Sequence, residues 1–360
     1  MEQYIFILGR DPALSKLEIE SYFKSRKIDF TILDESEIAL VIKLPTINAK
    51  KIMKDLGGTQ KIAKIITSFE GLYNGKENKI RYAISNYTED EENYKDELKA
   101  YFKQEGLKAT IKKSHFKESF LTPSEAQGVL EIIQYNGAIA KTVAVFDPKE
   151  QKSRDLDRPV QPSAQTTSIR LAKILINLTG VSPGQTLLDP YCGIGTIVQE
   201  AVLLGVNSIG IAFTSEDKSG SIKNLSWIRK KYNPSAKFKI NFGDPMKLSR
   251  LVKKVDCVAT EPYMGPSFKF FPSEGEAKKL LKQLEPKYTR LIEELSKVSK
   301  GTVVIIAPRF RTRSKKELSL SLEPIFKKNN FSFGEPIMYA SPTSRMLREI
   351  WILKPNSSKS

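Results

Sequence analysis

The chain has 360 residues, which is enough for two or three domains with a sizeable buried core. Its 58 basic and 41 acidic side chains give a formal net charge of +17, and residues 1–150 hold equal numbers of both, so the whole surplus lies in residues 151–360. A strongly basic half indicates a polyanionic partner, above all a nucleic acid. We favour this interpretation over a lysine-rich surface that serves solubility alone.

The same composition argues against a membrane protein, a secreted protein and a metalloprotein. The sequence has no apolar run long enough to cross a bilayer, and its Met-Glu-Gln start carries no signal-peptide pattern. The two cysteines, Cys192 and Cys257, and the single histidine, His115, cannot assemble a zinc cluster, so we expect no metal. We therefore expect a cytoplasmic protein with reduced thiols. Its oligomeric state stays open, and a monomer is the working assumption.

The first 150 residues alternate short strands with helices, as α+β domains do. Before a Gly- and Asn-rich stretch we expect strands and helices at 4–8, 12–23, 38–44, 49–56 and 61–67. This order favours a ferredoxin-like domain over residues 1–75. Beyond it, a second α+β domain over 76–147 is expected, with elements at 79–85, 94–105, 108–113, 123–130, 132–135 and 141–146.

The rest of the chain has the pattern of an α/β domain. Residues 148–164 are polar and flanked by prolines, which predicts a linker, and a Ser/Lys tail follows at 356–360. Between them, residues 165–355 alternate strand and helix as a doubly wound parallel sheet does. The expected strands lie at 186–188, 208–213, 238–242, 255–259 and 302–307. Two last runs, at 336–340 and 348–353, are close enough to pair as an antiparallel hairpin on the sheet's edge.

The turn after the first of these strands is the most informative feature of the chain. The strand ends on Asp189 and leads into a turn with Gly193 and Gly195, which let the backbone approach a ligand that a Cβ atom would push away. A dinucleotide site would need a third glycine where Val198 stands, and its pyrophosphate would sit poorly beside an acid. An ammonium-bearing ligand suits the turn better, and S-adenosylmethionine is the common cofactor with one.

Two further turns follow strands of the same expected sheet, at the edge where such sheets bind ligands. Asp244, with Pro245 after it, is able to accept a hydrogen bond from an exocyclic amine such as that of adenine, although an ordinary turn aspartate would have the same sequence. Glu261-Pro262-Tyr263 presents a carboxylate beside an aromatic ring. Such a pair would stack a flipped base on Tyr263 while an acceptor holds the amino group of the base.

With these motifs the chain resembles, over nearly its whole length, the THUMP-domain RNA methyltransferases, in particular the archaeal-type enzymes that methylate the exocyclic amine of guanosine-10 in tRNA. Residues 189–196 are similar to the family's D-P-x-C-G-x-G-T cofactor motif, and residues 135–145 resemble the closing strands of its THUMP unit. The resemblance implies a THUMP-like RNA-binding domain over 76–147 and a Rossmann-like class I methyltransferase domain over 165–355. It also implies S-adenosylmethionine as the cofactor and RNA, in the first place tRNA, as the partner.

The resemblance also assigns the site residues. Glu261, Pro262 and Tyr263 fall on the family's catalytic loop, which reads Asp/Asn-Pro-Pro-Tyr. The residues implied to bind the cofactor are Thr167 near its methionine carboxylate, Asp244 and Pro245 at its adenine, and Asp189, Tyr191, Cys192, Gly193, Gly195 and Thr196 in the glycine motif.

Two departures from the family pattern keep other functions open. Ala212 stands where the family has the acid that holds the ribose hydroxyls. Glu216 and Asp217, a turn later, are the candidates to substitute for that acid, although their spacing does not fit a direct replacement. The catalytic loop lacks one proline and has Glu261, whose extra methylene moves the acceptor by roughly an ångström, a displacement that can cost about 100-fold in rate. An RNA methyltransferase, a DNA amino-methyltransferase and a non-catalytic RNA-binding protein that keeps the fold all remain compatible with the sequence.

Overall fold

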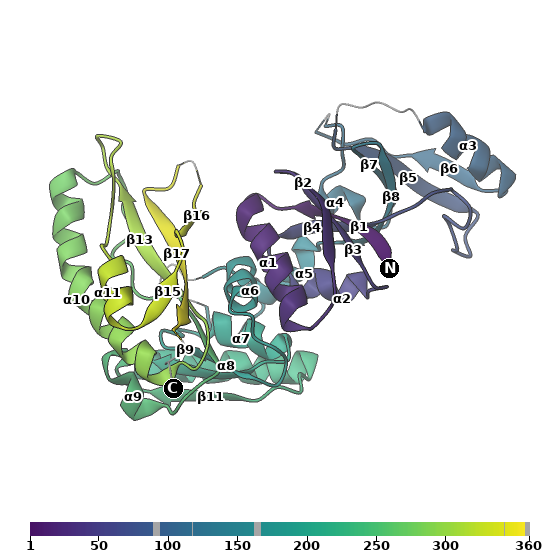
Figure 1. The fold of residues 1–360 in the computed structure, drawn as a ribbon. Coiled ribbons are helices and arrows are strands. Elements are labelled where there is room, and N and C mark those ends of the chain that lie inside the picture. Colours follow the sequence, from purple (N-terminus) through teal and green to yellow (C-terminus); the bar gives the residue numbers. More distant parts are fainter. Residues whose placement is uncertain (89–93, 117, 162–166, 342, 357–360) are drawn as a thin grey trace. The chain divides into compact units, whose positions relative to one another are not determined.

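The structure is a computed structural model that describes residues 1–88, 94–116, 118–161, 167–341 and 343–356 (Figure 1). Most of the expected tail, from 357 onward, and the last residues of the expected linker, 162–164, lie outside the described residues. The chain divides into two compact units, Met1–Lys16 with Lys27–Arg154 and Leu17–Arg26 with Asp155–Ser360.

The first unit is built on a mixed sheet. Its strands are β1 (Glu2–Leu8), β2 (Thr31–Glu35), β3 (Ala39–Leu44), β4 (Thr59–Ile65), β5 (Lys79–Asn86), β6 (Lys108–Ile111), β7 (Leu130–Tyr135) and β8 (Ala138–Val145). They form one eight-stranded sheet in the order β2-β3-β1-β4-β8-β7-β5-β6. The helices of this part of the chain are α1 (Pro12–Ser25), α2 (Ala49–Asp55), α3 (Lys95–Gln104), α4 (Pro123–Ala126) and α5 (Pro148–Leu156).

The first four strands confirm the ferredoxin-like expectation. They follow the chain order β-α-β-β-α-β, and β1 pairs antiparallel with both β3 and β4, while β2 pairs antiparallel with β3. Strand β4 also pairs with β8, so strands from both sides of residue 75 share one sheet. The division into domains 1–75 and 76–147, and the THUMP-like character of the second, therefore stay predictions. Helix α5 occupies the first half of the expected linker.

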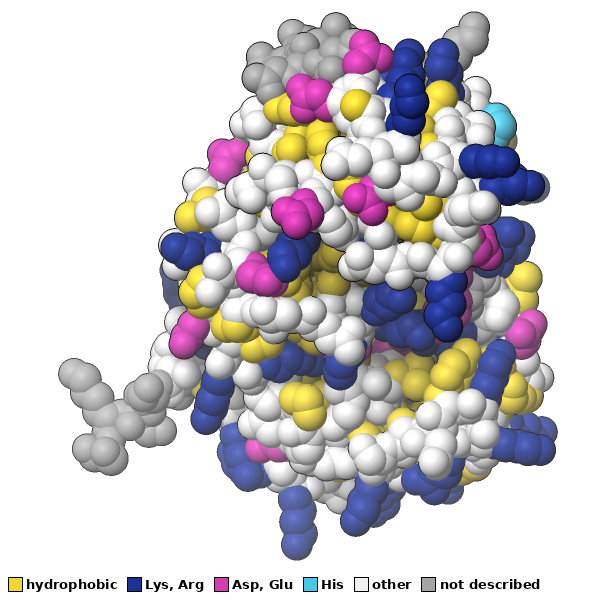
Figure 2. Space-filling view, turned by 90° about the vertical axis from the view of Figure 1, so that its right-hand side faces the viewer, with side chains coloured by type: hydrophobic (Ala, Val, Ile, Leu, Met, Phe, Trp, Pro, Cys, Tyr) yellow, Lys and Arg dark blue, Asp and Glu magenta, His cyan; other side chains and the backbone are white. Residues whose placement is uncertain are grey.

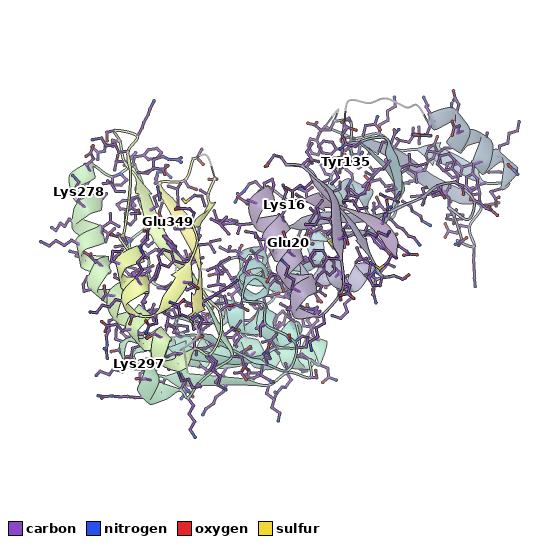
Figure 3. The ribbon with its side chains drawn as sticks, in the orientation of Figure 1. Lys16, Glu20, Tyr135, Lys278, Lys297 and Glu349 are labelled. Atoms are coloured by element: carbon purple, nitrogen blue, oxygen red, sulfur yellow. The ribbon has the colours of Figure 1, made fainter. Side chains whose placement is uncertain are left out.

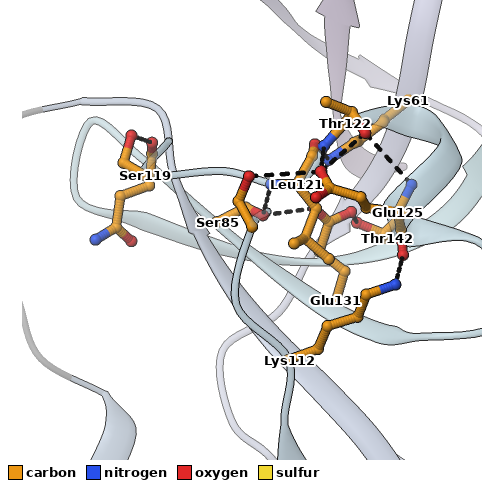
Figure 4. Close-up of polar contacts among 11 residues, drawn as sticks. Lys61, Ser85, Lys112, Ser119, Leu121, Thr122, Glu125, Glu131 and Thr142 are labelled. Atoms are coloured by element: carbon orange, nitrogen blue, oxygen red, sulfur yellow. Dashed lines mark hydrogen bonds and ion pairs between the residues drawn. The ribbon is translucent and has the colours of Figure 1, made fainter. Parts of the chain in front are cut away.

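A buried charged network lies inside this sheet (Figure 4). Lys61 of β4 and Glu131 of β7 are fully buried and form an ion pair, and Lys61 also donates to the Leu121 carbonyl oxygen at 2.7 Å. Glu131 accepts further hydrogen bonds from the hydroxyls of Ser85, at 2.5 Å, and Thr142, at 2.9 Å. Burial lowers the pKa of Lys61, and the charge of Glu131 opposes that shift. Both buried charges are thus paired and hydrogen-bonded, as their desolvation requires.

The second unit holds the expected doubly wound sheet. Its strands are β9 (Thr186–Asp189), β10 (Asn207–Ala212), β11 (Phe238–Phe242), β12 (Cys257–Thr260), β13 (Val303–Arg311), β14 (Glu317–Ser319), β15 (Phe331–Phe333), β16 (Ile337–Tyr339) and β17 (Met346–Pro355). Its helices are α6 (Ile169–Leu178), α7 (Thr196–Leu203), α8 (Ser215–Tyr232), α9 (Leu248–Leu251), α10 (Glu274–Val298) and α11 (Glu323–Lys328), with a short 3₁₀ helix η1 (Pro245–Lys247).

The order of this sheet is β11-β10-β9-β12-β13-β17-β15. Strands β9 to β13 are parallel, and β17 pairs antiparallel with both β13 and β16, which confirms the expected terminal hairpin. The apolar stripe of α10, which includes Leu284, Tyr288 and Leu291, packs in one core with strand residues such as Val258 and Ile305. The chain proceeds from β9 to β10 on one side and later to β12 on the other. In such sheets this switch point is where ligands bind.

Candidate active site

A cavity of about 440 Å³ lies at the carboxyl ends of β9, β10 and β12, where the topology predicts a ligand site. Its wall includes the glycine turn, the loop after β12, the beginning of α8 and two residues of β17. Of the residues that the sequence assigned to the site, the wall contains Thr167, Asp189, Tyr191, Cys192, Gly193, Thr196, Glu261, Pro262 and Tyr263. Segments almost one hundred residues apart in the chain thus meet at the expected edge of the sheet.

Asp189 is the most deeply buried carboxylate of this wall, with 2% of its surface exposed. Burial is the main cause that raises its pKa from 3.8 to about 7, and the charge of Glu261 adds to this shift. Hydrogen bonds from the Thr260 hydroxyl and the Tyr191 backbone N–H act in the opposite direction and lower the pKa. The two bonds are 2.8 Å and 3.1 Å long. A cation bound at Asp189 would favour the ionised form of this carboxyl group.

The two glycines of the turn have different structural roles. Gly193 has a φ of +48° and lies on the cavity wall, where an added Cβ atom would meet nothing within 4 Å. Gly195 has a φ of +90° and is the N-cap of α7, and an added Cβ atom would come within 3.3 Å of the Ser221 Oγ. Ser221 donates to the Gly193 carbonyl oxygen at 2.5 Å. Gly193 therefore leaves room for a ligand, whereas Gly195 shapes the turn and is not among the wall residues.

Glu261 is held by two side chains from distant segments. The Arg348 Nε donates to its Oε1 at 2.7 Å, and the Thr167 hydroxyl donates to its Oε2. Thr167 was expected at the methionine end of the cofactor, and the structure places it on the wall in contact with the catalytic loop. Arg348 has no counterpart in the sequence prediction, because nothing local distinguishes it from other strand residues. The next residue of β17 is Glu349, which is labelled in Figure 3. Its Oε1 forms an ion pair with the Arg309 Nε at 2.6 Å.

Tyr263 presents its ring at the cavity rim. Its surface is 56% exposed, and the Lys287 ammonium lies 5.7 Å from the ring centroid. Pro262 before it is buried, and Gly265 after it has a φ of +104°, which turns the chain sharply. The loop thus keeps the ring accessible while the backbone beneath it is fixed.

Asp244 and Pro245 do not belong to the cavity wall. Asp244 caps η1 by accepting from the Met246 backbone N–H at 2.9 Å, and Pro245 is buried. Burial raises the pKa of Tyr191, and the charge of Asp244 adds to that shift. The adenine-binding role of both residues stays a prediction. The wall instead contains Phe213 and Asp217, which the sequence assignment left out.

The composition led us to expect neither a membrane span nor a metal site. Among them, no helix is long and apolar enough to span a membrane. Within the same part of the chain, no three His, Cys, Asp or Glu side chains gather as a metal-binding group. Burial raises the pKa of both free cysteines, to about 12 for Cys257.

The sheet order, its antiparallel β17 and the crevice above β9 define a Rossmann-like class I methyltransferase fold. A family model described as an RMKL-like methyltransferase domain matches residues 158–243. TrmN from Thermus thermophilus has the same fold, with a TM-score of 0.53 and 13% identity over 98% of this chain and 99% of that one. The expected methyltransferase domain and its cofactor class, S-adenosylmethionine, are thereby confirmed.

Curated relatives identify the kind of methyltransferase to which the chain is similar. The tRNA (guanine(10)-N2)-dimethyltransferase of Methanothermobacter thermautotrophicus is 26% identical over 285 residues, which cover 74% of this chain and 79% of that protein. The protein of the same name from Methanocaldococcus jannaschii is 30% identical over 164 residues, 44% of this chain and 41% of that protein.

Proposed function

We propose that this protein is a cytoplasmic enzyme that methylates an exocyclic base amine in RNA, and more specifically the N2 of a guanine in tRNA. The observation that carries this proposal is the meeting of Asp189, the glycine turn and Glu261-Pro262-Tyr263 on the wall of one cavity. The relatives named tRNA (guanine(10)-N2)-dimethyltransferase support the choice of substrate over DNA.

The charge of the molecule supports a polyanionic substrate. The net charge is +17, and Lys and Arg side chains are scattered over the face shown in Figure 2, with Asp and Glu side chains between them. In the first unit, Lys79 and Arg81 of β5 and Lys108 of β6 are exposed and line one groove. Such a groove suits an RNA backbone, which supports the proposed THUMP-like role of residues 76–147.

The wall residues fit S-adenosylmethionine, which supplies an electrophilic methyl group when bound. Asp189 would accept hydrogen bonds from its ammonium group, and the buried position of this carboxylate strengthens the attraction to a cation. Gly193 leaves the space that a side chain would fill. Tyr191, Cys192 and Thr196 complete the wall around the same turn.

Glu261 and Tyr263 would position the base. The exposed ring of Tyr263 offers a stacking surface for a nucleotide turned out of its helix. Each Glu261 oxygen accepts one hydrogen bond, from Arg348 or from Thr167, and retains a further lone pair for the amine. Because these two bonds fix the carboxylate before the substrate arrives, little reorganisation is needed when charge develops on the amine. Alignment of this kind is the main requirement of an in-line methyl transfer.

The proposal is tested by transfer of tritiated methyl groups from S-adenosylmethionine to bulk tRNA, rRNA and DNA, followed by nucleoside analysis. We expect label in N2-methylated guanosine of tRNA. Label in DNA would instead support a DNA amino-methyltransferase. Binding of tRNA without transfer to any of the three polymers would support an RNA-binding protein that has lost catalysis.

A further inference from the structure

The last residue of β10, Ala212, is unable to supply a ligand to the cavity. Its side chain is fully buried in an apolar cluster with Cys192, Val198 and Leu225, on the side of α7 and α8. An acceptor for the part of a cofactor that extends over β10 must therefore come from another residue.

Two residues that follow β10 do reach the cavity wall. Phe213 is 64% exposed, and Asp217 lies in the first turn of α8. The Thr214 hydroxyl caps this helix by accepting from the Asp217 backbone N–H at 3.0 Å, which fixes the place of Asp217 in the first turn. Burial raises the pKa of Cys192, and the charges of Asp189 and Asp217 add to that shift, so both carboxylates lie near the glycine turn.

Among the described residues, Asp217 differs from the other two carboxylates of the wall because neither of its oxygens accepts a hydrogen bond. Asp189 accepts from Thr260 and Tyr191, and Glu261 accepts from Arg348 and Thr167. In the part of the chain that the structure describes, the Asp217 side chain has no hydrogen-bond or ion-pair partner. Its lone pairs are available to a ligand.

The sheet order decides which part of the cofactor lies near Asp217. Glu261 follows β12 on one side of β9, and Asp217 follows β10 on the other. A cofactor with its ammonium group at Asp189 and its transferable methyl group on the Glu261 side would extend its adenosyl part toward β10. The ribose of that part has two neighbouring hydroxyl donors, and one carboxylate accepts from both.

We propose that Asp217 accepts the hydrogen bonds of the cofactor's ribose hydroxyls, in place of an acid at position 212. This inference rests on the proposed function. It assigns cofactor recognition to the first turn of α8 and not to the end of β10.

The test is isothermal titration of the full-length protein with S-adenosylhomocysteine. We expect Asp217→Asn to weaken binding about 10- to 100-fold, the usual loss for hydrogen bonds to a charged group. Glu216→Gln is the matched control, because Glu216 is an exposed carboxylate of the same helical turn that is not part of the wall. It should leave the affinity unchanged, and thermal unfolding should show that both variants are folded.

A second titration identifies the ribose. An S-adenosylhomocysteine analogue without its 2′ and 3′ hydroxyls should bind the wild type weakly, and Asp217→Asn should weaken it no further. The assignment of Asp217 would be overturned if Asp217→Asn bound S-adenosylhomocysteine as tightly as the wild type does. It would also be overturned if the substitution weakened binding of the analogue as much as binding of S-adenosylhomocysteine. Either result would leave the proposed function standing. A wild-type protein that does not bind S-adenosylhomocysteine would overturn the proposed function together with the assignment of Asp217.

Discussion

Replacement of Asp189 by asparagine is expected to stabilise the second unit while it weakens cofactor binding. The Asp189 carboxyl group has a pKa of about 7 in the folded protein and 3.8 without the effects of folding. Because the folded value is the higher one, the folded state binds more protons between these two pH values. The contribution of Asp189 to stability is therefore greatest below about pH 4, falls as the pH rises to the folded pKa and is constant above it.

The magnitude follows from the size of the shift. Each pKa unit corresponds to about 1.4 kcal/mol, so the raised pKa of Asp189 lowers the stability of the folded state by on the order of 4 kcal/mol at pH 8 and by roughly 2 kcal/mol at pH 5. The Thr260 hydroxyl and the Tyr191 N–H both donate to Oδ1 of Asp189, so the asparagine oxygen is able to accept both bonds, and asparagine carries no charge to desolvate. The stabilisation by Asp189→Asn should therefore be larger at pH 8 than at pH 5.

Urea unfolding followed by tryptophan fluorescence measures this difference. Both tryptophans of the chain, Trp227 and Trp351, belong to the second unit, so the signal reports on that unit. Asp244→Asn is the control, since Asp244 also follows a parallel strand and accepts a backbone N–H but is only partly buried. The reasoning would be refuted if the Asp189→Asn variant had no higher free energy of unfolding than the wild type at pH 8. It would also be refuted if the substitution raised the free energy of unfolding by the same amount at pH 5 and pH 8.

Three other substitutions test separate parts of the structure. Glu261→Gln should lower the rate of methyl transfer about 100- to 1,000-fold, the usual loss of a preorganised electrostatic group, while titration shows normal S-adenosylhomocysteine affinity; an unaffected rate would contradict the role of Glu261. Gly193→Ala and its control Gly184→Ala should each lose about 1–2 kcal/mol of stability to left-handed backbone strain, at φ values of +48° and +87°, but only the first should weaken S-adenosylhomocysteine binding. Lys61→Met leaves Glu131 buried without its partner and should cost about 3–5 kcal/mol in urea unfolding followed by circular dichroism; a loss below 1 kcal/mol, on the scale of about 0–1 kcal/mol for surface pairs, would show that the ion pair is not buried.

Much of the fold could be predicted because its apolar residues follow regular periods. The strands of the parallel sheet are short apolar runs, and the stripe along α10 repeats with helical spacing. Elements without that signal were missed. Strand β2 alternates exposed and half-buried residues, β14 and β15 have three residues each, and α5 has no buried residue. The pairing of β4 with β8, which joins the two front segments in one sheet, depends on contacts between distant segments and leaves no local pattern.

The candidate site could be predicted as far as it consists of contiguous motifs. The glycine turn and the Glu261 loop each follow a strand directly, so their meeting at one edge follows from parallel topology. The two bonds that hold Glu261 could not be predicted, because Arg348 and Thr167 lie far from it in the chain. The sequence offered Glu216 and Asp217 alike as replacements for the acid at position 212, and only the start of α8 places Asp217 on the wall.

The central claim is that the turn after β9 holds a sulfonium cofactor whose reactive group faces the loop after β12. A crystal structure of the protein with S-adenosylhomocysteine tests it most directly. We expect the amino group of the ligand within hydrogen-bond distance of Asp189 and its sulfur atom directed toward Pro262 and Tyr263. An empty cavity at saturating ligand, or a ligand bound away from Tyr263, would contradict the account.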